Sequence, residues 1–385
     1  MEVSSPGRAT VVPETSPSAG SDSALSEKPK VPKTTRNGSI EGLRGFSALA
    51  VLLVHSIMMV RDLFFPFTIT RAFDESLKAI SRGSVCLFFM ISGYLIVQSL
   101  VRHSNIRVFL LNRVVRIYPV FATLHLIIYT LGPLARYDWM GNLRGKPLDY
   151  IVSFLANLFF LPGTISESKL PIAQSNAWSL SYEFVFYLVA CLYFAGFRER
   201  AHRGWLAALL LTLAVGITGG YVFSHPLAIF FICGVITYRY QEQLRAWKAP
   251  VWWRESGILW LILTFMFVRT NIFTSIQANI FTSAIFGLLF FASIVPEWGL
   301  FSRLMQCSPF TYLGRISYSL YLTHPFAVTF VREVMKRVAP YLGGKVVSFV
   351  VYEILGLALA LVVAHCSYQW IEVAFTNRFL RLKKA

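Results

Sequence analysis

The sequence carries little charge for its length. Only 14% of its 385 residues are Asp, Glu, Lys or Arg and 55% are hydrophobic, whereas soluble domains carry nearly twice that charged fraction. Strand-like alternation is scarce, and no hydrophilic stretch after residue 40 is long enough for a folded soluble domain. These absences exclude a soluble globular protein. They indicate an all-α, polytopic membrane bundle whose chemistry takes place inside the bundle or at its rim.

Several chemical motifs are also missing. The sequence contains no Gly-rich phosphate loop, no metal-ligand cluster and no G-x-S-x-G elbow, so we expect no metal and no permanently bound cofactor. The net charge of +17 comes from basic residues scattered between apolar segments. This pattern is typical of membrane topology and of contact with anionic membrane lipids, and it argues against a nucleic-acid partner. The five cysteines stand singly, without metal or redox spacing, and are interpreted as packing residues.

Apolar runs of membrane-spanning length recur from residue 46 to residue 371. An additional run, 149–162, is short and lies between Gly- and Pro-bearing segments, so it is predicted to be a re-entrant or surface helix. Lys and Arg are more frequent on the side that carries the amino terminus, which predicts that both termini are cytoplasmic. The ten predicted spans are 45–62, 83–101, 116–133, 178–196, 205–222, 226–239, 256–271, 277–294, 316–333 and 346–371.

The two ends of the chain differ from the apolar middle. The first forty residues are rich in Ser, Pro, Thr and charge and contain no apolar stretch long enough for a secretory signal. We therefore predict three parts: a disordered cytoplasmic tail over 1–39, a transmembrane domain over 40–376 and a basic cytoplasmic tail over 377–385.

Ionisable side chains within a membrane span are costly and therefore mark candidate functional sites. In the helix that contains the first predicted span, Arg44 and His55 are eleven residues apart, which is three turns plus about 20°, so they share one helix face. Arg44 is expected at the cytoplasmic edge, with His55 roughly 16 Å further along the axis. The alternatives are that Arg44 is a topology anchor and that His55 hydrogen-bonds a neighbouring helix.

Two other spans contain candidate acid–base residues. Glu183 lies about one and a half turns into its helix, at a depth that we expect to match His55. Such residues can form a catalytic acid–base pair, in which the carboxylate fixes the imidazole tautomer, or a structural ion pair. His324 lies near the middle of its helix beside Pro325 and is either a functional residue or a satisfied core histidine.

Two segments are candidates for substrate contacts. Arg113 and Arg116 lie in a predicted cytoplasmic segment, three residues apart and so adjacent on a helix surface. They can clamp the phosphates of a soluble acyl carrier such as coenzyme A, or contact anionic lipid headgroups. Ser92, Gly93 and Tyr94 lie in mid-helix, where they serve close helix packing or, for Ser92, substrate contact.

Together these segments resemble the acyltransferase 3 family of membrane-bound O-acyltransferases over nearly all of residues 40–376. The order and spacing of six elements make the resemblance specific. They are EGLRG with the histidine that follows it, FFMISGY, RVVRIYP, WSLSYEFVFY, YLGRISYSLYLTHP and the closing SYQWIEVAF with Glu372.

The resemblance implies transfer of an acetyl or other acyl group from cytoplasmic acyl-CoA to a hydroxyl of a sugar or lipid-linked glycan, in a bacterial inner membrane. It implies a stand-alone enzyme, because the chain ends ten residues after Phe375 without a fused hydrolase-like domain. His55 is then the general base or a transient acyl carrier. By matching positions, the implied roles are catalysis for Arg44, His55 and Glu183, donor binding for Arg113 and Arg116, and substrate binding for Ser92, Tyr94, Trp178, Ser181 and His324.

A secondary transporter or flippase with a buried His, Glu and Arg relay is the alternative function. Against it, the sequence shows no internal repeat and no matched pair of broken helices.

Overall fold

The computed structural model describes residues 37–68, 70–103, 105–133, 146–161, 172–199, 204–269 and 274–382. These residues form helices and no strand, as the composition predicts. The α-helices are α1 Gly38–Val60, α2 Arg71–His103, α3 Ile106–Leu131, α5 Pro147–Leu158, α7 Trp178–Glu199, α8 Gly204–Ser224, α9 Ile229–Arg239, α10 Gln241–Ala246, α11 Val251–Glu255, α12 Gly257–Phe267, α13 Ile276–Ile294, α14 Gly299–Met305, α15 Ser308–Val338, α16 Lys345–Ser367 and α17 Ala374–Leu382. Short 3-10 turns precede α7 (η1, Ser175–Ala177) and α9 (η2, Pro226–Ala228) and follow α15 (η3, Ala339–Tyr341), and a π-helical segment joins α16 to α17 (η4, Tyr368–Val373).

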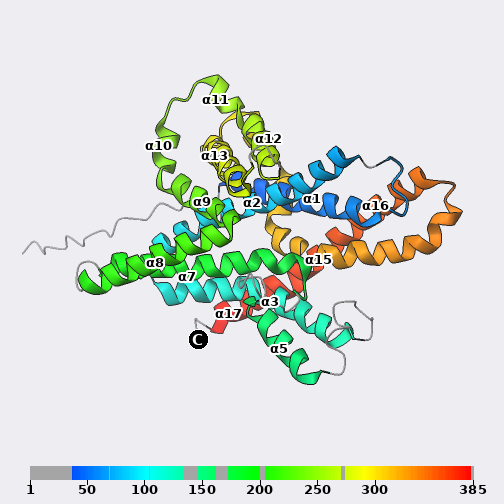
Figure 1. The fold of residues 1–385 in the computed structure, drawn as a ribbon, viewed down its shortest axis with the longest axis horizontal. Coiled ribbons are helices and arrows are strands. Elements are labelled where there is room, and N and C mark those ends of the chain that lie inside the picture. Colours follow the sequence, from blue (N-terminus) through cyan, green and yellow to red (C-terminus); the bar gives the residue numbers. More distant parts are fainter. Residues whose placement is uncertain are drawn as a thin grey trace, which may run out of the picture. The chain divides into compact units, whose positions relative to one another are not determined.

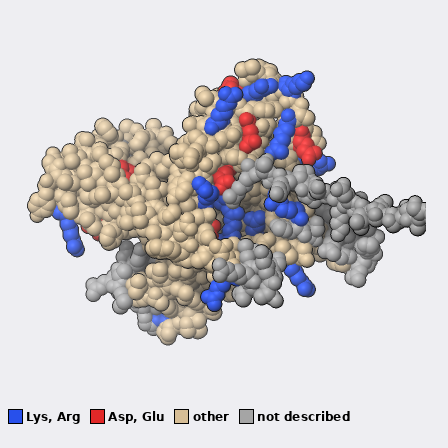
Figure 2. Space-filling view, turned by 180° about the vertical axis from the view of Figure 1, so that it is seen from behind, with Lys and Arg blue, Asp and Glu red and all other residues tan. Residues whose placement is uncertain are grey.

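Long apolar helices dominate the described residues. Six stretches are long and apolar enough to cross a membrane: α1, α2, α3, α7, α13 and the run from α16 into α17. Shorter apolar helices occur within α8, η2–α9 and α12. Uncharged residues also cover most of the face seen in Figure 2. The chain is therefore an integral membrane protein. All ten predicted spans fall on helices, but the count of ten crossings is not confirmed.

The first helix packs along α15 in the same direction. Figure 1 shows α1, α15 and α16 side by side. A Cβ on Gly45 would overlap the carbonyl oxygen of Phe310, and a Cβ on Gly314 would overlap the carbonyl oxygen of Glu41. Glycines at these positions therefore let the two backbones touch, as small residues do between membrane helices. A parallel pair is the arrangement expected for the first and ninth of ten successive crossings.

The helix α3 begins earlier than its apolar run suggests. The side chain of Asn105 caps it by accepting from the backbone N–H groups of Arg107 and Val108. The helix continues through Pro119, and Thr123 donates to the carbonyl oxygen of that proline. The predicted cytoplasmic segment before the third span is therefore continuous with that span: Arg113 and Arg116 lie within α3.

Two other predicted boundaries change. The short run 149–162 forms α5, whose twelve residues Pro147–Leu158 agree with a surface or re-entrant helix rather than a full crossing. At the carboxyl end, α17 includes residues 377–382 of the predicted basic tail, and 383–385 lie outside the described residues. Residues 1–36 of the predicted amino-terminal tail also lie outside them.

Candidate active site

The α1–α15 pair brings two histidines together. His55 and His324 are 269 residues apart in the chain, the same offset as Gly45 and Gly314, so the glycine contact fixes the register that aligns them. The distance from Nδ1 of His55 to Nε2 of His324 is 3.0 Å, a hydrogen bond. The sequence predicted a carboxylate partner for His55, whereas the partner in the structure is a second imidazole.

The hydrogen bonds around this pair assign both tautomers. Nδ1 of His324 lies 3.1 Å from the carbonyl oxygen of Leu320, which can only accept, so Nδ1 carries the hydrogen and Nε2 accepts. His55 must then donate from Nδ1 to that Nε2. In the neutral imidazole, Nε2 of His55 carries a lone pair that accepts from the hydroxyl of Ser81 over an Oγ–Nε2 distance of 3.4 Å. The arrangement leaves His55 as a neutral base.

The His55 side chain also borders open space. His324 is fully buried, but His55 is half-buried and lines a cavity of about 390 Å³, here called the histidine cavity. Ser81 and Arg82 of α2 also line it, as do Asn176 and Trp178 at the start of α7. A volume of this size lies within the range of small-molecule pockets. The predicted substrate residue Trp178 therefore lies in the same cavity as His55.

A second cavity collects guanidinium groups. It has a volume of about 70 Å³ and is called the arginine cavity, because Arg44 of α1 and Arg113 and Arg116 of α3 line it. The guanidinium of Arg113 lies 5.8 Å from the ring centre of Tyr187, a cation–π contact. Neither Arg44 nor Arg116 has a carboxylate within ion-pair distance in the described residues. The cavity is therefore electropositive.

Glu183 lies in the arginine cavity and not beside His55. Its Oε1 accepts from the hydroxyl of Ser92 at 2.6 Å, and its Oε2 accepts from the hydroxyl of Tyr187 at 2.7 Å. The predicted acid–base pair of His55 and Glu183 is therefore absent, and His324 occupies the position expected for the carboxylate.

The reason is the depth at which α7 begins. The amide of Gln174 donates to the carbonyl oxygen of Leu322 at 3.2 Å, and the amide of Asn176 donates to that of Tyr321. Ser179 and Tyr321 also join their hydroxyls at 3.0 Å. The chain therefore enters α7 level with the middle of α15. Five residues further along, Glu183 lies roughly 8 Å beyond that level, whereas the prediction started the helix at the membrane surface.

The two cavities are neighbours. Val85 of α2 and Tyr321 of α15 line both of them. The Tyr321 hydroxyl also donates to the carbonyl oxygen of Asn176 at 3.0 Å, so its ring is held between the cavities. The Tyr321 side chain therefore lies between the cavity that contains the base and the cavity that contains the arginines.

Comparison with known proteins shows the family of this chain. A family model described as an acyltransferase domain, of the acyltransferase 3 family, matches residues 37–366. The chain belongs to this family. The resemblance drawn from the sequence motifs is thereby confirmed.

Individual relatives are distant. Peptidoglycan O-acetyltransferase OatA of Listeria monocytogenes is 24% identical, over 90% of this chain and 57% of the relative. Acyltransferase MdmB of Streptomyces mycarofaciens is 28% identical, over 48% of this chain and 46% of the relative. Nodulation protein 10 of Rhizobium leguminosarum is 27% identical, over 56% of this chain and 57% of the relative. The chain spans about half the length of these curated relatives. No solved structure matches it significantly.

Three of the predicted substrate-binding residues line neither cavity: His324, which is fully buried against His55, and Tyr94 and Ser181. Tyr94 is 1% exposed, and its hydroxyl donates to the side-chain oxygen of Gln241. The hydroxyl of Ser181 donates to the carbonyl oxygen of Phe160 at 3.0 Å. In the structure all three side chains make contacts within the protein, so their predicted part in substrate binding gains no support from position.

The structure adds one acidic residue to the arginine cavity's surroundings. Glu372 lies on the π-helical segment η4, accepts from the hydroxyl of Ser319 at 3.2 Å and interacts electrostatically with Arg44 and Arg116. Such π-helical insertions are frequent at functional sites. The sequence contained a signal, since Glu372 closes an apolar span, but no site role was assigned to it. Among the described residues, no three His, Cys, Asp or Glu side chains gather as a metal site would require.

Proposed function

We propose that the protein transfers an acyl group, with acetyl as the first candidate, from acyl-CoA to a hydroxyl of a glycan at the cell surface. The observation that carries this proposal is the neutral His55 base in a cavity that adjoins an electropositive one. Family membership and the name of MdmB support acyl transfer, and the name of peptidoglycan O-acetyltransferase OatA supports O-acetylation and a polysaccharide acceptor.

The donor enters on the side of the arginine cavity. Arg113 and Arg116 project from one face of α3, where they attract the phosphates of acyl-CoA as charge-assisted donors. About 70 Å³ holds several waters or a small acyl thioester but no nucleotide, so the nucleotide stays at the mouth. The positive-inside rule supports a cytoplasmic location for this side, and the family resemblance supports a bacterial inner membrane.

The acceptor enters the histidine cavity, and its hydroxyl donates to Nε2 of His55. The hydroxyl oxygen attacks the thioester carbonyl carbon while its proton passes to that nitrogen. The carbon–sulfur bond then breaks, and the coenzyme A thiolate takes the proton from His55. Throughout, Nε2 of His324 accepts a hydrogen bond from Nδ1 of His55, as a carboxylate does in other acid–base pairs.

A related route uses the same nitrogen as a nucleophile. Nε2 of His55 attacks the thioester carbonyl carbon, the carbon–sulfur bond breaks, and coenzyme A leaves as the thiolate. The acceptor hydroxyl then attacks the acyl-imidazole, the carbon–nitrogen bond breaks to free Nε2, and the hydroxyl proton ends on the thiolate. Both routes need a neutral His55 whose side chain borders the histidine cavity.

The test is turnover of radiolabelled acetyl-CoA by the purified protein with solubilised peptidoglycan strands as acceptor. We expect His55→Ala to lower the rate by about 10²- to 10⁴-fold, because it removes the base. His365→Ala is the matched control: His365 is exposed, bonds only to Tyr312 and lines neither cavity. Full turnover in His55→Ala would refute the proposal. Label retained on the wild-type chain selects the covalent route, and glycan movement without consumption of acetyl-CoA selects a transporter.

A further inference from the structure

The histidine cavity has a one-sided charge. Three cationic side chains line it, Lys78 and Arg82 from α2 and Arg269 from the residues that follow α12. Among the described residues, no Asp or Glu lines it. The cavity that holds the base is therefore also suited to negative charge.

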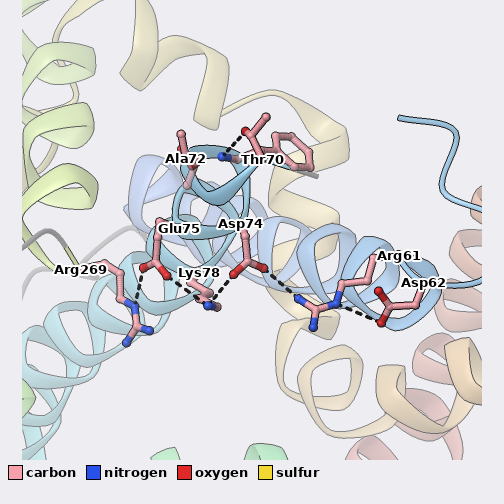
Figure 3. A network of polar contacts seen from close by, with 10 residues as sticks. Arg61, Asp62, Thr70, Ala72, Asp74, Glu75, Lys78 and Arg269 are labelled. Carbon is pink, nitrogen blue, oxygen red and sulfur yellow. Dashed lines mark hydrogen bonds and ion pairs between the residues drawn. The ribbon is translucent and has the colours of Figure 1, made fainter. Parts of the chain in front are cut away.

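Two of these cations are partly neutralised by a chain of ion pairs at the rim (Figure 3). Nζ of Lys78 lies 2.6 Å from Asp74 and 3.1 Å from Glu75, and Nε of Arg269 lies 3.2 Å from Glu75. Asp74 is shared further with Arg61 at 2.9 Å. Both carboxylates are therefore already engaged with other cations and have no unpaired charge to offer Arg82.

Arg82, the third cation of the histidine cavity, takes no part in these ion pairs. It is half-buried, and in the described part of the chain its guanidinium makes no hydrogen bond and no ion pair. The charged residue with which it interacts electrostatically has the same sign, since it is Arg269. Within the described ranges Arg269 uses only Nε, on Glu75, so its two terminal nitrogens can also donate. Two guanidiniums thus share one cavity with unused donors.

Such an arrangement is unfavourable until an anion arrives. Half-buried like charges repel one another and lose hydration. A carboxylate or phosphate group between them can accept hydrogen bonds from both guanidinium groups at once. Donor phosphates already have three arginines in the other cavity. The neighbour of Arg82 in the chain, Ser81, is the residue that contacts Nε2 of His55. An anion at Arg82 would therefore lie close to the reacting hydroxyl.

Building on the proposed function, we infer that the acceptor is anionic. Arg82 and Arg269 bind a carboxylate or phosphate carried by the acceptor sugar, while His55 takes the proton of a hydroxyl on the same sugar unit. A cavity of about 390 Å³ is large enough for one such unit.

Binding to the purified protein without any acyl-CoA tests the inference. The probes are methyl β-D-glucuronide, the neutral methyl β-D-glucoside and a methyl glucoside 6-phosphate, titrated by calorimetry. We expect wild type to bind at least one charged sugar about tenfold or more tightly than the neutral one, as charge-assisted hydrogen bonds allow. Arg82→Gln should abolish this preference, and Arg82→Lys should restore part of it, because a lysine keeps the charge without the fork.

The matched control is Arg332→Gln, which removes one arginine that pairs with Glu333 and lines neither cavity. It should keep the wild-type preference. Equal binding of charged and neutral sugars by wild type would overturn the inference, as would a preference that survives in an Arg82→Gln protein with normal thermal unfolding. The tighter of the two anions identifies the charged group.

A second arm separates this inference from the proposed function. Each sugar is also offered with radiolabelled acetyl-CoA. Tight, Arg82-dependent binding without label transfer supports the anion site and contradicts acyl transfer to these sugars. Label transfer that ignores the sugar's charge supports acyl transfer and contradicts the anion site.

Discussion

The arginine cavity and the histidine cavity contain different chemical groups within one helix bundle. In the arginine cavity, both oxygens of the Glu183 carboxylate accept from hydroxyls, those of Ser92 and Tyr187. The guanidiniums that line the cavity can therefore donate to an anionic ligand. In the histidine cavity, the reactive group is a neutral imidazole held by another imidazole. The difference teaches that attraction of the acyl donor and proton transfer are kept apart here.

One helix connects the two tasks. Arg44 and His55 both lie on α1, eleven residues and roughly 16 Å apart along its axis, and each lines its own cavity. The glycine contacts with α15 fix the register of both ends of this helix at once. Variants can therefore damage one cavity and leave the other intact, and such variants test the comparison.

The largest effect is expected from the partner of the base. His324→Leu removes the acceptor for the Nδ1 hydrogen of His55, so the imidazole is free to turn or to change tautomer. We expect the catalytic rate constant to fall by about 10²- to 10⁴-fold while the affinity for acetyl-CoA stays unchanged. Steady-state kinetics and donor titration measure the two quantities separately.

A conservative variant distinguishes positioning from simple loss of packing. The side-chain oxygen of glutamine can accept the same hydrogen, so His324→Gln should recover at least about tenfold of the lost rate. In wild type the rate should fall with falling pH, because a protonated imidazole cannot take a proton. His324→Leu should alter that pH profile, which a variant that only unfolds in part would leave unchanged. An unaltered profile and no recovery by glutamine would contradict the role of His324.

The next effect concerns the arginine cavity alone. Arg116→Gln removes one guanidinium that has no carboxylate partner among the described residues, and with it a charge-assisted contact to the donor. We expect KM for acetyl-CoA to rise by about 10- to 100-fold with a smaller change in kcat. The control is Arg107→Gln, an exposed arginine on the same helix. Equal effects of the two variants would show that general surface charge, not the cavity, attracts the donor.

Much of this architecture was accessible from the sequence. Apolar runs marked every long helix, because a span must satisfy its own backbone hydrogen bonds and needs a fixed length. The spacing of Arg44 and His55 predicted one shared helix face, and both side chains do line interior cavities. These features are local, and helical periodicity is enough to find them.

The predictions that were wrong concern contacts between segments that are distant in the sequence. The depth of Glu183 depends on the amides of Gln174 and Asn176, which fix the start of α7 against the middle of α15. The pairing of His55 with His324 depends on a register set by glycines on two helices. Hydropathy assigns no relative height to separate helices, so neither contact could be predicted from one sequence.

The smallest effect should come from Tyr94, and it sharpens the comparison within a single motif. Ser92 and Tyr94 are two residues apart on α2, so their side chains point about 200° apart around the helix. Ser92 reaches Glu183 in the arginine cavity, whereas the hydroxyl of Tyr94 reaches Gln241. Tyr94→Phe should therefore leave kcat and KM unchanged and lower stability by about 1 kcal/mol, measured by thermal unfolding in detergent.

Ser92→Ala is the matched change on the opposite face. It frees one oxygen of Glu183, which can then turn toward the nearby guanidiniums and compete with the donor, so KM for acetyl-CoA should rise severalfold. A kinetic defect in Tyr94→Phe as large as that in Ser92→Ala would mean that both residues of the motif reach substrate. The separation of packing from ligand contact on this helix would then be wrong.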